Sequence, residues 1–382
     1  MSEWKEVALQ DVVTILGDGL HGTPNYSDDG EYYFINGNNL RNGKIVVDER
    51  TKKASIEEYK KYKKDLNERT ILVSINGTLG NVALFNNEKC FLGKSACYFN
   101  VRDDVDKLFI KYVVTNRHFQ KYIDIFAHGS TIKNVSLKTI REYPFELPPL
   151  PEQRAIAGVL SSLDDKIDLL HRQNQTLEAL AQTLFRQWFV EEAEDDWEEG
   201  VLGDVIEIFD SKRIPLSKME REKMKEGKLY PYYGAASIMD YVNDYLFDGE
   251  YILLGEDGTV LTDEGYPVLQ YATGKFWVNN HTHVIQAKYP YSNYFIWTYL
   301  QKKSIRDIVT GAVQPKINQK NLKSIDFPKY PIEKINDFNK QLSPLFEKKI
   351  TNNSQIHTLE KLRDMLLPKL MSGEVRIRGG IL

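Results

Sequence analysis

The chain has 382 residues, 42% of them hydrophobic and 27% charged, which is enough for two or three domains that each bury a core. No run reaches the roughly 18 to 20 apolar residues of a membrane span, and the first residues lack a secretory signal pattern, so we expect a cytoplasmic protein without membrane contact. The formal net charge of −4 weighs against DNA binding, because phosphate contacts need a basic face. Much of the negative charge lies in the run 191–199, however, which is typical of a solvated linker.

Two stretches of different sequence, 16–130 and 209–311, share the turn-rich, aromatic and β-branched composition of mixed, β-rich domains. Short apolar runs that end at glycine turns predict inner strands at Thr70–Ile75 and Tyr251–Leu254. The two cysteines fit neither a zinc site nor a redox pair, and we expect both to be buried in a reducing compartment. The predicted helices of these domains are Ser55–Lys64, Leu108–Ile123 and Asn293–Ile308.

The chain repeats itself once. Trp4–Ile15 matches Trp197–Ile208, with Trp, Glu, Leu, Asp, Val and Ile at the same places in both segments. Agreement in order at the start and the end of both copies predicts two related domains. Their divergent interiors suit either two readers of different targets or an old duplication that drifted. Near the end of each copy, before a proline-bearing stretch leads into a helix, the matched pairs are Leu137–Ile140 with Leu322–Ile325 and Tyr143–Pro144 with Phe327–Pro328.

The segment 151–190 carries the clearest periodic signal in the chain. Its apolar positions alternate four and three residues apart, which predicts a narrow coiled-coil seam along a helix of roughly 60 Å. Pro151 suits the first turn of this helix, where its missing N–H is not needed. The seam consists of Ile156, Leu160, Leu163, Ile167, Leu170, Asn174, Leu177, Ala181, Leu184 and Trp188.

A second helix with a similar seam is predicted near the C-terminus, where Pro344 should kink the helix or start its second half with Ser343 as the cap. In an antiparallel pair, Asn174 would face Asn352. Such a buried asparagine pair would fix the register at some cost in stability, whereas a hydrated edge position for each asparagine is an equal alternative. The second seam consists of Phe338, Leu342, Leu345, Lys349, Asn352, Ile356, Leu359, Arg363 and Leu366.

These patterns predict an α+β protein in which two mixed, β-rich domains are separated by two long helices. The helices would form an antiparallel coiled coil and the chain an internal pseudo-twofold repeat. The first domain would span 1–147, the central helix 148–193, the second domain 194–330, and the C-terminal helix and tail 331–382. Domains at opposite ends of the helix pair would suit two half-sites on the order of one DNA turn apart, ~34–36 Å.

Three helical blocks resemble the specificity subunit of type I restriction–modification enzymes: Leu147–Ile156 (LPPLPEQRAI), Leu163–Ile167 (LDDKI) and Leu359–Glu374 (LEKLRDMLLPKLMSGE). The resemblance extends over the whole chain. It implies two target recognition domains that each read one half of a split double-stranded DNA sequence, and helices that dock two methylation subunits, with restriction/translocase subunits further out. It also implies a non-catalytic chain without cofactors of its own, with S-adenosylmethionine, ATP and Mg on the partner subunits.

The residues themselves offer no catalytic constellation. Gly93–Ser95 lacks the first glycine of a phosphate-binding loop, because Glu88 stands in its place. No set of acid, base and nucleophile recurs in both copies, which disfavours an enzyme with a duplicated catalytic domain. His281 and His283 are two residues apart, so the alternation of a predicted strand places both on the same face. There they could contact a metal ion or a DNA base. Since no carboxylate or cysteine completes a metal site, we expect no metal and a structural or solvent-facing pair.

Polar loops near the end of both copies are the candidate DNA contacts, because polar and basic side chains bind phosphates and base edges. Gly129–Asn134 and its counterpart Gly311–Asn318 begin with glycine, and each carries a lysine and an amide, which suits paired reading loops or, equally, two ordinary turns. Weaker candidates for DNA contact are the glycine turns after the inner strands and an aromatic side chain that could wedge between bases. The full candidate set is Asn36, Asn38, Asn76, Thr78, Ser130, Thr131, Lys133, Asn134, Tyr233, Asp257, Thr259, His281, His283, Gln314, Lys316 and Asn318.

A rival interpretation is a coiled-coil scaffold that binds proteins through its globular heads and has no DNA specificity. The near-neutral charge and the aromatic content of 12% favour this scaffold slightly. The matched loops and the family resemblance favour DNA recognition, which is the function that the sequence predicts.

Overall fold

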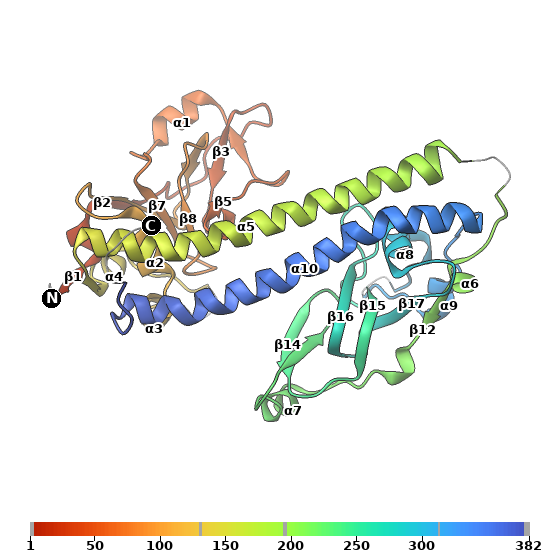
Figure 1. Ribbon diagram of the computed structural model, residues 1–382. Helices are drawn as coiled ribbons and strands as arrows, with labels where there is room; N and C mark the ends of the chain where they lie inside the picture. Colours follow the sequence, from red (N-terminus) through yellow and green to blue (C-terminus); the bar gives the residue numbers. More distant parts are fainter. Residues whose placement is uncertain (1–3, 130–131, 194–196, 312–313, 378–382) are drawn as a thin grey trace. The chain divides into compact units, whose positions relative to one another are not determined.

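The computed structural model describes residues 4–129, 132–193, 197–311 and 314–377. The chain forms two compact units: unit 1 consists of Met1–Asp168 and His357–Leu382, and unit 2 of Leu169–Ile356. The chain leaves unit 1 along the helix α5 (Leu150–Arg186) and returns to it along α10 (Ile332–Met371), as Figure 1 shows. Each unit therefore contains one globular domain and a segment of each long helix.

The globular part of unit 1 is built on a four-stranded sheet in the order β2-β10-β7-β8. Every residue of the two central strands, β7 and β10, is buried, which is why these strands read as continuous apolar runs. The strands are β1 (Lys5–Ala8), β2 (Val13–Asp18), β3 (Tyr32–Ile35), β4 (Leu40–Arg41), β5 (Lys44–Ile45), β6 (Lys53–Ala54), β7 (Thr70–Ser74), β8 (Val82–Leu84), β9 (Cys90–Leu92), β10 (Ala96–Val101) and β11 (Pro144–Leu147). The helices are α1 (Ile56–Tyr62), α2 (Lys107–Thr115), α3 (Arg117–Ile125) and α4 (Leu137–Arg141).

The globular part of unit 2 is built on a six-stranded sheet in the order β12-β17-β15-β16-β13-β14. Three of these strands, β16, β15 and β17, lie side by side in Figure 1. The strands are β12 (Ile206–Ile208), β13 (Tyr230–Tyr233), β14 (Ile238–Val242), β15 (Phe247–Gly255), β16 (Leu269–Val278) and β17 (Thr282–Ala287). The helices are α6 (Leu202–Val205), α7 (Lys218–Lys223), α8 (Asn293–Leu300) and α9 (Gln319–Lys323).

The two sheets share one strand order, with β2, β10, β7 and β8 of unit 1 corresponding to β12, β17, β15 and β16 of unit 2. The pairing register of the corresponding strands is also the same in the two sheets. The last residue of β7 pairs with the first residue of β10 (Ser74 with Ala96), and the last residue of β15 pairs with the first of β17 (Gly255 with Thr282). The next residue along, Cys97 in unit 1, therefore corresponds to His283 in unit 2. The internal repeat predicted from the sequence is present in the structure.

Two predicted helices of the globular domains are shorter in the structure. The segment predicted as one helix, Leu108–Ile123, is interrupted at Asn116, whose backbone ends α2 and whose side chain accepts a hydrogen bond from His118 N at the start of α3. The helix predicted to reach Ile308 ends at Leu300, because the polar run Gln301–Ser304 offers no apolar side chain for the core. A separate 3-10 turn covers Arg306–Ile308.

The long helices are continuous, which rules out one of the two predictions for Pro344, the start of a second half. No new helix begins there, and Ser343 is not a cap, since α10 runs unbroken from Ile332 to Met371. The Ser343 hydroxyl donates a hydrogen bond to the Asn339 carbonyl, at 2.9 Å. Tertiary packing of both neighbouring turns, through Leu342 and Phe346, holds the proline inside the helix. Among the described residues, no helix has both the length and the hydrophobicity that crossing a membrane requires.

In unit 1 the two helix segments are held together and to the globular domain by Asp164, in the LDDKI block. Its carboxylate accepts hydrogen bonds from Lys111 Nζ (2.5 Å) and Tyr112 Oη (2.8 Å) on α2 and from Arg363 Nη1 (3.1 Å) on α10. Burial alone would raise the pKa of Asp164, but these three partners together lower it. Asp164 is therefore the ion-pair centre of the helix pair in this unit.

In unit 2 the helix segments run antiparallel and meet at the predicted asparagine pair. Asn352 Nδ2 donates to Asn174 Oδ1 at 2.9 Å, and Asn174 Nδ2 donates to Asn353 Oδ1 at 2.8 Å. Both Asn174 and Asn352 are buried, so the hydrated-edge alternative is wrong. Trp188 and Phe338, two positions of the predicted seams, are also in contact, with ring centroids 5.6 Å apart.

The end of the α5 seam differs from the prediction. Phe185 and Phe189 are buried there, whereas the predicted Leu184 and Trp188 are half-buried. The reason is that the helix end packs against an aromatic cluster of the unit 2 domain as well as against α10. Phe189 lies 5.0 Å from Phe295 and 4.7 Å from Tyr330, measured between ring centroids.

Candidate nucleic-acid interface

Two loops meet at the end of the central strands in both units, and we call this arrangement the loop clasp. In unit 1 it consists of the turn 76–80 after β7 and the loop residues 128–129 and 132–134, and in unit 2 of the turn 256–259 after β15 and the loop residues 310–311 and 314–316. Bridges join Asn76 to Asn134 and Asp257 to Lys316 across the two loops. Half of the candidate DNA contacts from the sequence lie in these segments.

The main-chain hydrogen bonds of the two clasps are the same. Gly77 N donates to Lys133 O at 2.9 Å in unit 1, and Gly258 N donates to Pro315 O at 3.0 Å in unit 2. Both glycines have positive φ, 75° and 78°, a conformation that side chains disfavour. The equivalent pairs are therefore Lys133 with Pro315 and Asn134 with Lys316. The lysine and amide that the sequence shows in each loop, Lys133 and Asn134 in unit 1 and Lys316 and Asn318 in unit 2, therefore do not occupy equivalent positions.

The same shift applies to the short helix that follows each clasp. Ser136 caps α4 by accepting from Thr139 N at 3.0 Å, and Asn318 caps α9 by accepting from Asn321 N at 2.8 Å. Downstream, Leu9 N donates to Tyr143 O, and Leu202 N donates to Ile325 O. Tyr143 thus corresponds to Ile325, not to Phe327. The sequence match of these segments was out of register, because it aligned similar letters rather than capping and pairing positions.

A polar pocket of about 450 Å³ opens beside the clasp of unit 1. Asp18 accepts a hydrogen bond from His21 Nε2 at 2.6 Å at its rim, and Asn76 Nδ2 donates to Asn134 Oδ1 at 3.4 Å. The pocket can present amide, carboxylate and cationic groups to a ligand at once. Its lining consists of Asp18, His21, Ile75, Asn76, Lys94, Asn134, Val135, Ser136 and Leu137.

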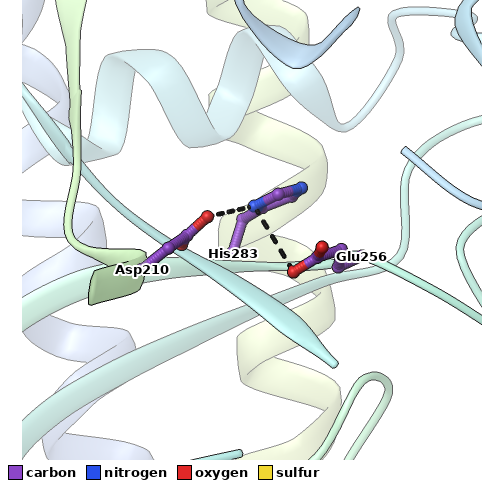
Figure 2. A group of neighbouring side chains, drawn as sticks. All are labelled: Asp210, Glu256 and His283. Atoms are coloured by element: carbon purple, nitrogen blue, oxygen red, sulfur yellow. Dashed lines mark hydrogen bonds and ion pairs between the residues drawn. The ribbon is translucent and has the colours of Figure 1, made fainter. Parts of the chain in front are cut away.

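The equivalent place in unit 2 is filled by ionisable side chains of this chain (Figure 2). His283 is fully buried, and its Nδ1 lies 2.6 Å from Asp210 Oδ2 and 4.0 Å from Glu256 Oε2. Arg213 donates to Glu256 Oε2 at 2.7 Å and lies 3.5 Å from Asp210 Oδ2. Burial alone would raise the pKa of Asp210, but the hydrogen bond and charge of His283, the Val284 N–H and Arg213 together lower it.

Asp210, Glu256 and His283 lie close enough together to share a metal ion, and among the described residues they are the one such group. The chemistry of the group argues for an ion-pair network instead. The Arg213 guanidinium already supplies the cation, and His283 Nε2 lies 2.8 Å from the Ile317 carbonyl oxygen, so neither ring nitrogen is free to coordinate. The sequence-based expectation that no carboxylate accompanies His283 was wrong, because the fold brings two of them from distant segments.

The exposed part of the unit 2 clasp carries a second layer of charged groups. His281 Nδ1 lies 2.6 Å from Asp257 Oδ1, and Lys316 Nζ lies 3.8 Å from Glu256 Oε1. His281 and Lys316 are exposed. This surface can offer a lysine, an imidazole and a carboxylate, where the unit 1 clasp offers two amides.

The remaining candidates divide into exposed and inner positions. Asn38, Thr78, Thr259 and Gln314 are exposed, as is Lys133, which pairs with Asp124. Asn36 accepts a hydrogen bond from Ser95 Oγ at 2.9 Å, so its side chain stabilises the protein's own loop. His283 is fully buried, so its prediction as a direct DNA contact is wrong. Ser130 and Thr131 lie outside the described residues.

Tyr233 is a packing residue rather than an exposed wedge. Its ring meets that of Phe276 edge-on, with centroids 5.6 Å apart, and burial raises its pKa to about 12. It pairs with Val278 as Ile35 pairs with Leu92 in unit 1, and Ile35 is a fully buried core residue.

Asp18, His21 and Lys94 in unit 1, and Asp210, Arg213 and Glu256 in unit 2, were not predicted. One signal in the sequence could have found part of this set. An acid followed three residues later by a basic residue stands at the end of β2 and two residues after β12, at Asp18–His21 and Asp210–Arg213.

A family model described as the type I restriction modification DNA specificity domain matches residues 1–179 and 194–361, and so both copies of the repeat. The type I restriction enzyme MjaIX specificity subunit of Methanocaldococcus jannaschii is 28% identical over 395 residues, which cover 93% of this chain and 86% of that protein. A putative type I restriction enzyme specificity subunit of Haemophilus influenzae is 33% identical over 148 residues, 39% of this chain and 36% of that protein.

A solved structure gives the same fold. The S subunit of the type I restriction–modification system from M. genitalium has a TM-score of 0.60 at 22% identity, and the match covers 96% of both chains. Two β-rich domains joined by two long helices are therefore an architecture that this chain shares with an experimentally determined protein.

Proposed function

Because this chain belongs to the specificity subunits of type I restriction–modification enzymes, we propose that units 1 and 2 each read one half of a split double-stranded DNA target through their loop clasps. In such an enzyme the chain serves DNA target recognition and is a non-catalytic component. The clasps, rather than the long helices, would select the sequence.

The observation that carries this proposal is the recurrence of one main-chain arrangement with different side chains. Asn76 and Asn134 of unit 1 are replaced at the same positions by Asp257 and Lys316 in unit 2. Amide side chains bind adenine edges best, whereas a carboxylate accepts from cytosine and a lysine donates to guanine or phosphate. The same main-chain arrangement with different side chains in the two units suits two half-sites of different sequence.

We further propose that the long helices dock two methylation subunits. Exposed apolar side chains occur on the helices of both units: Leu362 and Met365 are 37% and 54% exposed in unit 1, and Leu180 and Val190 are 44% and 61% exposed in unit 2. Exposed apolar side chains on the helical segments of both units suit two copies of one partner. Restriction/translocase subunits would join further out, and S-adenosylmethionine, ATP and Mg would be bound by the partner subunits.

The docking proposal has a direct test. The double substitution Leu362→Glu and Met365→Glu should reduce the number of methylation subunits that co-purify per chain from two to one. The matched control is Lys361→Glu, a charge reversal at the exposed position directly before Leu362. A stoichiometry of two in the double variant would contradict the proposed docking surface of unit 1.

DNA reading is tested by reconstituting the chain with a methylation subunit and sequencing the methylated adenines of the treated DNA. The expected result is a motif of two short specified parts separated by unspecified base pairs. Methylation without sequence preference would overturn the proposal and favour the coiled-coil scaffold that binds only proteins.

A further inference from the structure

We propose that Asp210, Arg213, Glu256 and His283 form a buried ion-pair network that positions the loop clasp of unit 2, and thereby sets how strictly this unit discriminates its half-site. The inference rests on the proposed DNA-reading function and deepens it. None of the four needs to touch DNA, and Asp210 and His283 are positioning residues that act through the loops they hold.

His283 contacts two distant segments of unit 2 through its two ring nitrogens. Nδ1 lies 2.6 Å from the Asp210 carboxylate, and Nε2 lies 2.8 Å from the Ile317 carbonyl oxygen. Both ring nitrogens are therefore engaged within the protein. The Ile317 carbonyl directly follows Lys316, which fixes the main chain at the exposed clasp residue.

Arg213 and Glu256 hold the other loop. Arg213 Nη1 donates to Glu256 Oε2 and to the Thr282 carbonyl, both at 2.7 Å. The Glu256 main chain is fixed as well, since its N–H donates to His281 O at 2.9 Å and its carbonyl accepts from Ile317 N at 2.8 Å. Asp257, the clasp residue that faces Lys316, comes next in the chain. The network therefore ends one residue away from the half-buried Asp257 and the exposed Lys316.

Asp210 is the common anchor of the network. Its Oδ2 accepts from Gln319 Nε2 at 2.7 Å, at the start of α9, and its Oδ1 accepts from Val284 N at 3.0 Å. The carboxylates of Asp210 and Glu256 both face the Arg213 guanidinium and the His283 ring, with Lys316 at the rim. Four segments distant in sequence, η4 (Asp210–Lys212), the turn after β15, β17 and α9, are thus tied together at one buried point.

Unit 1 shows that this network is not needed to form the clasp. The position of His283 is taken there by the buried Cys97, and that of Glu256 by the buried Ile75. Ile75 O still accepts from Val135 N at 2.9 Å, as Glu256 O accepts from Ile317 N. Burying four ionisable groups costs desolvation energy, and apolar residues often serve stability equally well. The network restricts the main-chain geometry of both loops that carry the clasp side chains.

The test uses the reconstituted complex and duplexes in which one half of its methylated motif is scrambled at a time. In His283→Gln, one donor remains and one of the two links is lost; in Asp210→Asn, the anchor loses its charge at constant size. Both variants should lower discrimination against the same scrambled half by about tenfold, the contribution of one well-read base pair. Discrimination against the other half should not change.

Cys97→Ala is the matched control, since it alters the equivalent position in unit 1, and it should leave discrimination against both halves unchanged. The proposal is overturned if the two network variants melt at lower temperature but discriminate both halves as the wild type does, because the network would then be structural only. An equal loss for both halves would also overturn it. Failure of the DNA-reading function itself is distinguishable, because the wild-type complex would then show no motif.

Discussion

The two loop clasps share the same main-chain hydrogen bonds, but the side chains behind them differ. In unit 1 the positions behind the loops are taken by Cys97 and Ile75, and a pocket of about 450 Å³ lies open beside Asp18 and His21. In unit 2 the same place is closed by His283, Asp210, Arg213 and Glu256. The comparison teaches that the glycine turns and cross-loop hydrogen bonds define the loop shape, whereas the side chains behind the loops are free to vary.

The comparison predicts that one acidic residue matters far more in unit 2 than its counterpart does in unit 1. Asp210→Ala leaves the Arg213 guanidinium and the buried His283 ring without one of their acceptors, which should cost about 3–5 kcal/mol of unfolding free energy. Asp18→Ala removes a partner of the exposed His21 and should cost less than about 1 kcal/mol. Amide hydrogen exchange of β17 and β10 under native conditions measures both values. Equal losses in the two variants would contradict the difference in burial.

The helix segments of unit 1 should depend on their ion-pair centre. Asp164→Ala removes the acceptor of Lys111, Tyr112 and Arg363 and should lower the free energy of unfolding by about 2–3 kcal/mol. Asp165→Ala, a neighbouring exposed position, is the control, and urea unfolding compares the two. If both substitutions have the same small effect, the helices of unit 1 are held by apolar contacts alone.

Unit 2 contains a second carboxylate, Asp240, that should make it sensitive to acid. Hydrogen bonds from Lys225, Tyr241 N and Arg221 outweigh the effect of burial and lower the pKa of Asp240 to about 2 from its ordinary value of 3.8. A lowered pKa stabilises the folded state above pH 3.8, and this contribution, at most ~2 kcal/mol, is lost as the pH falls towards 2.

Asp240→Asn should therefore be less stable than the wild type at pH 6, and the difference should vanish near pH 2. Unfolding by urea at a series of pH values gives the result, with the exposed Asp244→Asn as the control. A difference that persists unchanged at pH 2 would mean that Asp240 is not held as a carboxylate by these partners.

The asparagine pair of the helices should give a smaller effect. Asn352→Ile alone leaves the Asn174 amide without one partner and should cost about 1–2 kcal/mol. Asn174→Ile together with Asn352→Ile should recover that stability but loosen the register of the helices. Cross-linking between cysteines introduced on the two helices reports the register. A double variant with unaltered register and assembly would disprove the idea that the pair specifies alignment.

The smallest expected effect is that of metal removal. Because Arg213 supplies the cation beside Asp210 and Glu256, treatment with a chelator should change neither the melting temperature nor DNA discrimination. Metal analysis of the purified chain provides the measurement. One tightly bound divalent ion per chain, lost together with discrimination, would replace the ion-pair network with a metal centre.

The sequence predicted the features that depend on periodicity and on local order. The seams of α5 and α10, the meeting of Asn174 with Asn352, and the repeat at Trp4 and Trp197 all follow from spacing along the chain. The break at Asn116 was missed, because an apolar pattern on both sides hides a capping residue. The burial of Phe185 was missed because it depends on an aromatic cluster from other segments.

The candidate site was predictable only in part. Glycine-led loops after the strands located the clasps, but single letters could not give their register. Lysines at 133 and 316 looked equivalent, whereas the hydrogen bonds pair Lys133 with Pro315. The ion-pair network could not be predicted from the sequence for a similar reason. Asp210, Glu256 and His283 are far apart in the sequence and meet only because β12, β15 and β17 are neighbours in one sheet.

The central claim is that each clasp reads one half of the DNA target. The most direct measurement is to sequence the adenines methylated by complexes that carry Asn134→Ala or Lys316→Ala, which alter equivalent positions of the two clasps. The prediction is that each substitution relaxes the motif in one half only, and that the two affect opposite halves. Relaxation of the same half by both, or an unchanged motif in both, would contradict the account.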